Sequence, residues 1–341
     1  MSSQQSPFLI SVFHSPFQFP PALWECFNAE PRNSNIIYAH AAKLRSTGIV
    51  TAPGPPVDVW IVCWRQGPAP IIEFVLSCTT GPLGAYPVFI YTPLPSEYLA
   101  LGFIQPRIHS IIGYLQSYVA PERVFSVFAL DPVADAFAAM WTAMTRVPLA
   151  TQPVYYHAQF MSCDRTTFKP GAQNGTARTP SPLRLAVPDD RIGVAALCHG
   201  FAASSEPFVL TEQMALYEAS LLINSNSVWV HTIQGPGQVT PDIACIVSVT
   251  RTTETVAAIT KVYTNPNYRS RGCAERLVRF ACASLLRTKQ SVVLYVAHNN
   301  QAAKKVYERV GFVGFAASGV GATDSWKELG FDQTLVRLGH W

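Results

Sequence analysis

The chain has 341 residues with a formal net charge of +4, and only 13% of its residues are charged. This length favours two domains over one, and the sequence has no dense basic run that would favour a nucleic-acid partner. No stretch stays apolar for the roughly 18 residues that a membrane-spanning helix needs, and the first residues lack the positive start of a signal peptide. We therefore expect a cytoplasmic protein with no membrane partner.

The eight cysteines are scattered, and no two of them stand at the CxxC spacing of zinc and redox motifs. We therefore expect no metal, and thiols that stay reduced. Hydrophobic residues make up 49% of the chain, a high share beside so little charge. This composition predicts an extensive buried interface, either between domains or between the subunits of a homodimer.

The first half of the chain alternates apolar runs typical of strands with helical patterns. "VWIVCW" (59–64) and "VFIYTP" (88–93) predict strands, and "ERVFSVFALDPVADAFAAMW" (122–141) predicts a strand, an aspartate and then a helix. "PRIHSIIGYLQSYV" (106–119) has helical spacing, and we expect this helix to open at Pro106. Such an order of elements indicates an α/β domain.

One long stretch without periodicity divides the chain nearly in half. "DRTTFKPGAQNGTARTPSPLRL" (164–185) is rich in Thr, Pro, Gly and Arg, a composition typical of a linker. We therefore predict an N-terminal domain over 1–165, a linker over 166–185 and a C-terminal domain over 186–341.

The second half places a polar turn between a strand and a helix. Residues 256–263 form an apolar run typical of a buried strand, which Pro266 ends, and helical spacing begins at Ala274. "RSRGCA" (269–274) lies between them, where the free N–H groups at a helix start and the helix dipole favour an anion. Because Gly272, Cys273 and Ala274 are small, a phosphate can approach this backbone closely.

The two halves repeat their patterns in the same order. Val124 corresponds to Val292, and Ala129 corresponds to Ala297 at the same offset. This predicts a diverged internal duplication, although any two α/β units share patterns of this kind. The first half has "PLPSEYLALGFIQPR" in place of the arginines and glycine of the turn, so we expect only the second half to bind a phosphate.

The second half resembles the GNAT (Gcn5-related N-acetyltransferase) superfamily. That family carries Arg/Gln-x-x-Gly-x-Gly/Ala between a strand and a helix, here Arg269, Gly272 and Ala274. Further along it carries an Asn, small residues, an aromatic residue and Gly-Phe, here Asn300, Ala302, Ala303, Tyr307, Gly311 and Phe312. The layout of two echoing halves resembles a group of fungal GNAT-like proteins. The resemblance implies an α/β (α+β) fold of tandem GNAT-like halves, with mixed, mostly antiparallel sheets flanked by helices and a degenerate first half.

The resemblance also implies how acetyl-CoA binds. The amides of the turn and its arginines would hold the pyrophosphate, and the edge of the preceding strand would pair with the pantetheine arm. The implied cofactor-binding residues are Val262, Tyr263, Thr264, Arg269, Ser270, Arg271, Gly272, Cys273, Ala274, Asn300 and Ala303. Tyr307 is the implied general acid for the thiolate, or else a core aromatic. Asn300 and Gly311 are equally suited to cap the helix between them.

The general base is the least determined part of this expectation. "CHGFAASSEPFVLTEQMALYEASLL" (198–222) resembles the family's first two helices and the loop that lines the acceptor pocket, and Glu206 on that loop is the first candidate. His231 and Glu254 are rivals, and the closing "VRLGHW" (336–341), expected to be the final strand, adds His340.

The predicted activity is the transfer of an acetyl group from acetyl-CoA to an amine of a small molecule. One alternative is a CoA-binding scaffold without catalysis, and another is a repurposed cleft whose chemistry does not use CoA. An intact anion-binding turn together with Asn300 and Tyr307 favours the enzyme. An occluded pantetheine groove would favour the scaffold.

Overall fold

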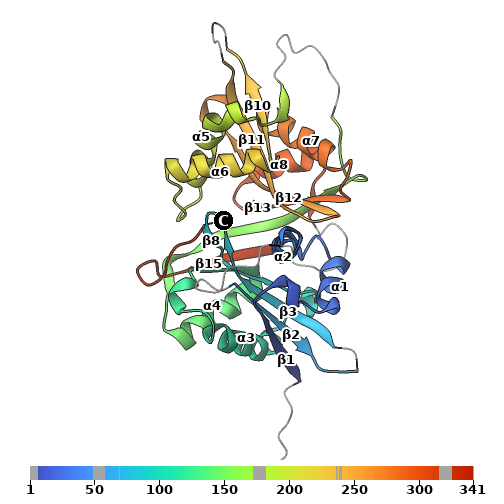
Figure 1. The fold of residues 1–341 in the computed structure, drawn as a ribbon, viewed down its shortest axis with the longest axis vertical. Coiled ribbons are helices and arrows are strands. Elements are labelled where there is room, and N and C mark those ends of the chain that lie inside the picture. The colour runs from blue at the N-terminus through green and yellow to red at the C-terminus, as the bar shows by residue number, and fades with distance from the viewer. Residues whose placement is uncertain are drawn as a thin grey trace, which may run out of the picture. The chain divides into compact units, whose positions relative to one another are not determined.

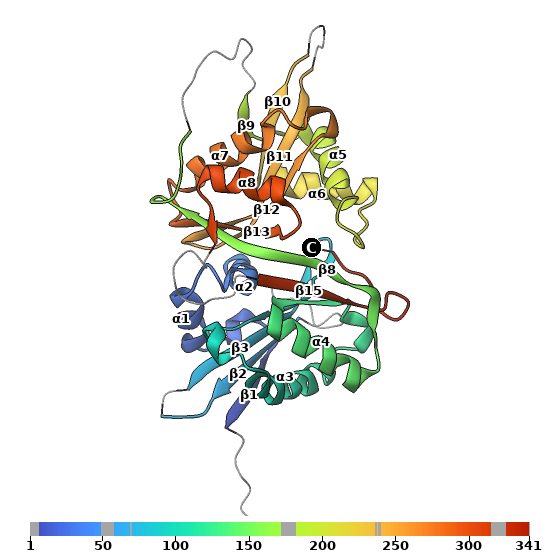
Figure 2. The same ribbon diagram turned by 180° about the vertical axis from the view of Figure 1, so that it is seen from behind.

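The computed structural model describes residues 7–48, 58–68, 70–171, 182–235, 237, 240–314 and 325–340. The chain forms two compact units, shown in Figures 1 and 2: unit 1 is Met1–Gln159 with Phe315–Trp341, and unit 2 is Phe160–Gly314. Unit 2 begins at Phe160, and it includes the predicted linker over 166–185. The end of the chain, which the sequence analysis assigned to the second domain, belongs instead to unit 1. No helix among the described residues is long and apolar enough to cross a membrane.

Unit 1 consists of a sheet with helices. In chain order its main elements are β1 (Phe8–Phe13), α1 (Pro21–Ala29), α2 (Asn35–Thr47), β2 (Val59–Arg65), β3 (Ile71–Cys78), β6 (Val88–Tyr91), α3 (Leu101–Gln116), β7 (Ser126–Leu130), α4 (Asp131–Thr145), the first part of β8 (Leu149–Asp164) and β15 (Ser325–Phe331). The last residues of β8, from Phe160, belong to unit 2. The short strands β4 (Thr80–Gly81) and β5 (Gly84–Ala85) form a separate hairpin.

The last strand of the chain completes the sheet of unit 1. The strand order there is β1-β2-β3-β6-β7-β15-β8, with β6 and β7 parallel and β15 antiparallel to both of its neighbours. Figure 2 shows β15 beside β8. The prediction of a final strand at "VRLGHW" (336–341) is wrong: the last strand ends at Phe331, and the described residues after it form no strand. Trp341 lies outside the described residues.

The expected opening of a helix at Pro106 is also wrong. α3 begins at Leu101 and encloses the proline. Pro106 lacks the N–H that would bond to the carbonyl of Gly102, and its ring crowds that carbonyl. Burial of an apolar face, which includes Ile104 and Ile108, outweighs that loss.

Unit 2 repeats the order of elements found in unit 1. Its elements are β9 (Leu183–Leu185), α5 (Arg191–Ala202), α6 (Glu212–Asn224), β10 (Val228–Ile233), β11 (Asp242–Thr252), β12 (Val256–Thr264), α7 (Cys273–Leu285), β13 (Ser291–Ala297), α8 (Gln301–Val310) and β14 (Val313–Gly314). Strands β9 to β12 are antiparallel, and β12 and β13 are parallel. The predicted α/β fold with mixed, mostly antiparallel sheets and flanking helices is confirmed.

Helices cover both faces of the sheet in unit 2. Successive side chains of a strand point to opposite faces. Val247 of β11 therefore packs with Leu277 of α7, whereas its neighbour Ile246 packs with Val194 of α5. The strand β12 thus has one side toward α7 and α8 and the other toward α5 and α6. The middle of the predicted linker, 172–181, lies outside the described residues.

We expect Gly311→Ala to destabilise unit 2. Gly311 ends α8 with a φ of +114°, and a Cβ there would lie 2.2 Å from the carbonyl oxygen of Thr167. The loss in free energy of unfolding should exceed the roughly 1–2 kcal/mol that a left-handed backbone alone costs an L-residue. Gly48→Ala is the matched control, because Gly48 has a φ of +65° and nothing within 4 Å of an added Cβ. Equal losses in denaturant unfolding would contradict the close contact.

Candidate active site

The turn between β12 and α7 has the backbone of an anion-binding site. Ser270 has a φ of 58° and Gly272 a φ of 70°, while Arg271 between them is not among the positive-φ residues. Alternation of this kind points successive N–H groups to one side and forms a concave nest for an anion. α7 begins at Cys273, so the N–H groups of its first turn, which have no acceptor within the helix, lie next to the nest.

The small size of Gly272 fits an anionic ligand at this turn. Its left-handed backbone is one that glycine adopts without strain. A Cβ at this position would lie 3.1 Å from Nη1 of Arg276, so the end of that side chain would have to move slightly. Cys273 and Ala274 follow as the first residues of α7; Cys273 is buried and Ala274 is half-buried.

Two exposed arginines of the turn rest on aromatic rings. The guanidinium of Arg269 lies 5.5 Å from the ring centre of Tyr263, and its Nε donates to the carbonyl of Thr264 at 3.3 Å. The guanidinium of Arg271 lies 5.3 Å from the ring of Tyr268. The ion pairs found within the described ranges involve neither arginine. Among the described residues, both guanidinium groups are thus held by aromatic rings and have no carboxylate paired with them.

The strand that leads into the turn separates from its parallel neighbour. β12 pairs with β13 only over Val256–Ala258, opposite Ser291–Val293, although β12 continues to Thr264. Along its other edge β12 stays paired with β11 as far as Thr264, with a register shift at Thr260. The backbone of Val262–Thr264 therefore has one edge that is not paired with β13.

Tyr307 lies in the core below this unpaired end of β12. Its side chain is 8% exposed and packs edge-on against Phe312, with the ring centres 5.7 Å apart. Burial raises the pKa of its hydroxyl, and the nearby thiol of Cys245 adds to the effect, so the hydroxyl keeps its proton at ordinary pH. Sγ of Cys245 in turn accepts from the hydroxyl of Thr264 at 3.3 Å. The ring is thus a core residue, close to the end of the strand.

Asn300 and Gly311 cap α8, as one of the sequence interpretations held. Oδ1 of Asn300 accepts from the N–H of Ala303 at 3.0 Å, and Gly311 ends the helix in a left-handed conformation. The capping role of Asn300 uses its carbonyl oxygen and leaves its amide group exposed at the helix start.

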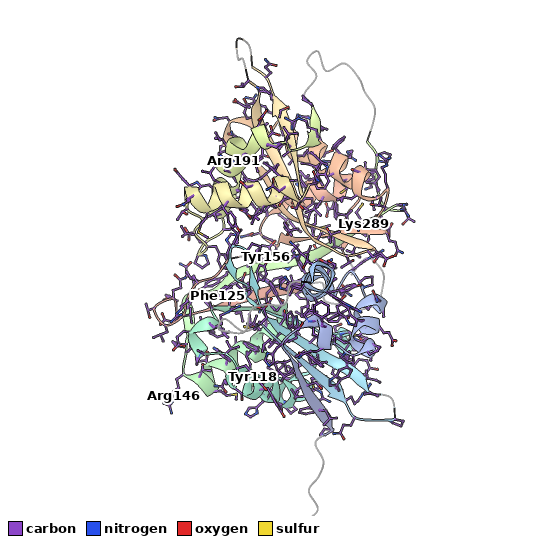
Figure 3. All side chains as sticks on the ribbon, viewed as in Figure 1. Tyr118, Phe125, Arg146, Tyr156, Arg191 and Lys289 are labelled. Carbon is purple, nitrogen blue, oxygen red and sulfur yellow. The ribbon has the colours of Figure 1, made fainter. Side chains whose placement is uncertain are left out.

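The candidates for a general base lie in different places. Glu206 is exposed on the connection between α5 and α6. Glu254 lies on the β11–β12 turn, at the end of β12 remote from the anion-binding turn. Its carbonyl and that of Thr253 accept from Nζ of Lys289, labelled in Figure 3, at 3.2 and 2.5 Å. His340 belongs to unit 1, where its N–H donates to the carbonyl of Ala85.

His231 is a core histidine on β10. It is 1% exposed, and burial, followed by the charge of Arg276, lowers its pKa to about 4. It is therefore neutral at physiological pH. The carbonyl of Cys273 is close enough to oppose this shift, which places the imidazole under the first turn of α7. Among the described residues its Nδ1 has no hydrogen-bond partner.

The sequence analysis missed an ion pair between Glu218 of α6 and Lys261 of β12. Both residues are buried, and Nζ of Lys261 contacts Oε1 of Glu218. A signal for it was present: Glu218 stands at a core position of its helix, between Ala215 and Leu222, and Lys261 interrupts an apolar strand. Charged residues at core positions are rarely unpaired.

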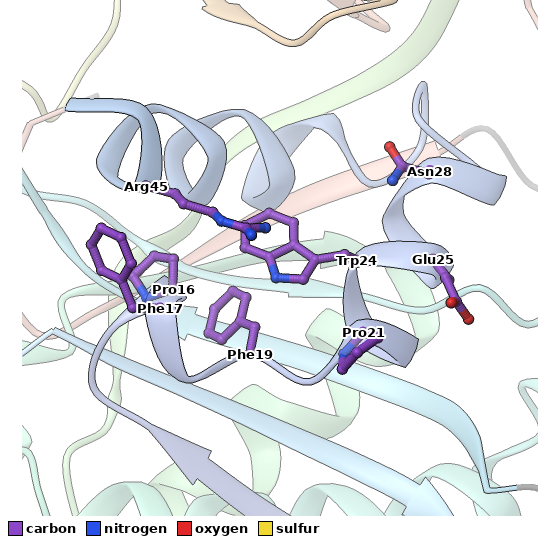
Figure 4. Close-up of a pocket in the computed structure, with 8 residues that line it drawn as sticks. All are labelled: Pro16, Phe17, Phe19, Pro21, Trp24, Glu25, Asn28 and Arg45. Carbon is purple, nitrogen blue, oxygen red and sulfur yellow. The ribbon is translucent and has the colours of Figure 1, made fainter. Parts of the chain in front are cut away.

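A surface pocket of about 380 Å³ lies in unit 1, and Figure 4 shows the residues that line it. Trp24, Phe17 and Phe19 supply aromatic rings, and the guanidinium of Arg45 lies 4.8 Å from the centre of the Trp24 ring. All of its lining residues precede β2, so it contains none of the residues of the anion-binding turn.

Part of the sequence matches a known protein family. Residues 196–312 match the family described as "Acetyltransferase (GNAT) family". The matched range contains the turn, both separated strands and all of α8. None of the curated proteins compared with the chain matches it.

Solved structures with a similar fold extend over nine-tenths or more of the chain. A Drosophila protein aligns with a TM-score of 0.59 and 12% identity, covering 90% of this chain and 94% of that one. A GCN5-related N-acetyltransferase from Sphaerobacter thermophilus aligns with a TM-score of 0.50 and 14% identity, covering 95% of each chain. At such identities the likeness concerns the fold alone. In sequence pattern and in fold, then, the region that holds the candidate site is similar to GNAT acetyltransferases.

Proposed function

We propose that this chain is an N-acetyltransferase that transfers an acetyl group from acetyl-CoA to an amine of a small molecule. The observation that carries the proposal is the separation of β12 from β13 directly before a turn that alternates the sign of φ. The match to the GNAT family over the same residues supports it.

The residues of unit 2 fit the parts of this cofactor. Acetyl-CoA, when bound, supplies an acetyl group activated as a thioester. In our proposal the N–H groups of residues 270–274 and the charges of Arg269 and Arg271 hold its pyrophosphate. The unpaired backbone edge of Val262–Thr264 holds the pantetheine arm, and Asn300 and Ala303 lie against the cofactor at the start of α8.

Three tasks remain for side chains: to orient the amine, to take its proton and to give a proton to the sulfur. We propose Glu206 as the proton acceptor, because it is exposed on the α5–α6 connection, where an amine can arrive from solvent. We propose Tyr307 as the donor, because it lies beside Cys245, which pairs with Thr264 at the end of β12 that would receive the thioester arm. The eight free cysteines agree with a cytoplasmic site of action, which we also propose.

We expect one acetyl-CoA site per chain. In unit 1 the helix that corresponds to α7 is α3, and it begins at Leu101 after an alanine, without arginines at its start. Its buried Arg107 donates from Nε to Glu73 at 2.6 Å, and that charge is thus already paired. Titration calorimetry with acetyl-CoA should give a stoichiometry near one. A value near two would contradict a degenerate first half.

The transfer reaction itself is tested by supplying acetyl-CoA with a panel of small amines and measuring release of the free thiol. Turnover with at least one amine is the expected result. Binding without turnover on any amine would favour the CoA-binding scaffold instead. A chain that folds but does not bind acetyl-CoA would overturn the proposal.

A further inference from the structure

The buried pair of Lys261 and Glu218 ties β12 to the helices on one face of the sheet. The side chains of Lys261 and Glu218 are 7% and 8% exposed, and Nζ contacts a carboxylate oxygen. Nζ also lies 5.5 Å from the ring centre of Phe201 on α5. One ammonium group thus joins the strand to both α5 and α6.

An ion pair at such a place is costly. Removing two charges from water costs several kcal/mol per ion, and well-packed apolar residues often stabilise a core at least as well. On the opposite face of β12 the side chain of Ile259 does pack among apolar residues. Overall stability is therefore a weak reason for a charged pair here, and its position on the strand is the more informative feature.

The pair is attached to the part of β12 that has no partner in β13. Lys261 follows Ala258, the last residue paired with β13, and adjoins the register shift at Thr260. Beyond it, Tyr263 packs so closely on α5 that a Cβ at Gly200 would lie 2.8 Å from its ring. Arg269 of the anion-binding turn lies against the same tyrosine ring. After Ala258, β12 is paired with β11 but not with β13. Contacts to α5 and α6 therefore hold this part of β12 in place.

We infer that Glu218 and Lys261 are positioning residues of the acetyl-CoA site. The pair holds the unpaired part of β12 in the conformation in which its backbone receives the thioester arm. This inference rests on the proposed function, because it concerns the same site. The pair acts through the backbone of Val262–Thr264, by keeping the binding-competent conformation populated.

The test is Glu218→Gln, which keeps the shape of the side chain and removes its charge. If the competent conformation falls to about a tenth of the population, the Kd for acetyl-CoA rises about tenfold. Calorimetry with acetyl-CoA measures the Kd, and hydrogen exchange should show faster exchange of the β12 amides after Thr260. The single variant Lys261→Arg keeps the positive charge, so its Kd for acetyl-CoA should stay near that of the native chain. If Glu218→Gln does not fold, Lys261→Met replaces it, with the same expected rise.

A matched control separates positioning from general stability. Glu73→Gln in unit 1 breaks the buried pair with Arg107, which likewise joins a strand to a helix. It should lower the melting temperature without changing the Kd. An unchanged Kd in a folded Glu218→Gln variant would overturn this inference and leave the acetyl-CoA site intact. A native chain that fails to bind acetyl-CoA would overturn the proposed function and this inference with it.

Discussion

Replacing Tyr307 with phenylalanine is expected to lower kcat by about 10²- to 10⁴-fold, the usual effect of losing a general acid. The ring stays in the core against Phe312, and only the hydroxyl is lost. Affinity for acetyl-CoA should change little, because the proposed phosphate contacts are made by the turn. A loss confined to kcat is what an interaction formed in the transition state predicts.

The same variant tests the alternative that Tyr307 only packs the core. In that case activity stays near that of the native chain, and the free energy of unfolding changes by about 1 kcal/mol at most. Tyr91→Phe is the control, because Tyr91 is a buried tyrosine of unit 1, where it is 1% exposed. Steady-state kinetics and melting curves on both variants decide between the roles, and full activity of Tyr307→Phe would end the general-acid hypothesis. An acceptor from the amine panel is needed first.

The double variant Arg269→Ala with Gly272→Glu is expected to weaken acetyl-CoA binding by more than about 100-fold. A hydrogen bond to a charged group contributes about 1.5–3 kcal/mol, and every 1.4 kcal/mol is about tenfold in affinity. The new carboxylate repels the phosphates, and its side chain has to find space beside Arg276. Because Gly272 has a φ of 70°, part of the effect comes from backbone strain.

Gly272→Ala measures that strain separately, since it adds a Cβ but no charge. We expect it to weaken binding far less than the double variant does. Calorimetry gives the affinities, and melting temperatures show whether each variant is folded. An acetyl-CoA affinity that stays the same in a folded double variant would show that the turn is not where the phosphates bind.

Local features of unit 2 could be predicted from the sequence because they depend on neighbouring residues. The strand before Pro266, the start of α7 near Gly272 and the caps of α8 each follow from spacing, size or backbone preference within a few positions. The separation of β12 from β13 does not follow from the local sequence, because periodicity does not say where two strands stop pairing.

Features that join distant residues could not be predicted in this way. Spacing shows that Glu218 lies on the core side of α6. It does not show that the side chain of Lys261 on β12 contacts it. The position of Ser325–Phe331 is a similar case. No local pattern in this segment shows that it lies between β7 and β8.

The place of β15 constrains the order in which the protein can mature on the ribosome. Residues 160–314 are contiguous and can fold once they have emerged, whereas the sheet of unit 1 lacks an inner strand until residues 325–331 have followed them. During that interval β7 and β8 have unpaired edges, which are templates for wrong pairing with other chains. Nascent unit 1 therefore keeps these two strand edges exposed until residues 325–331 have emerged.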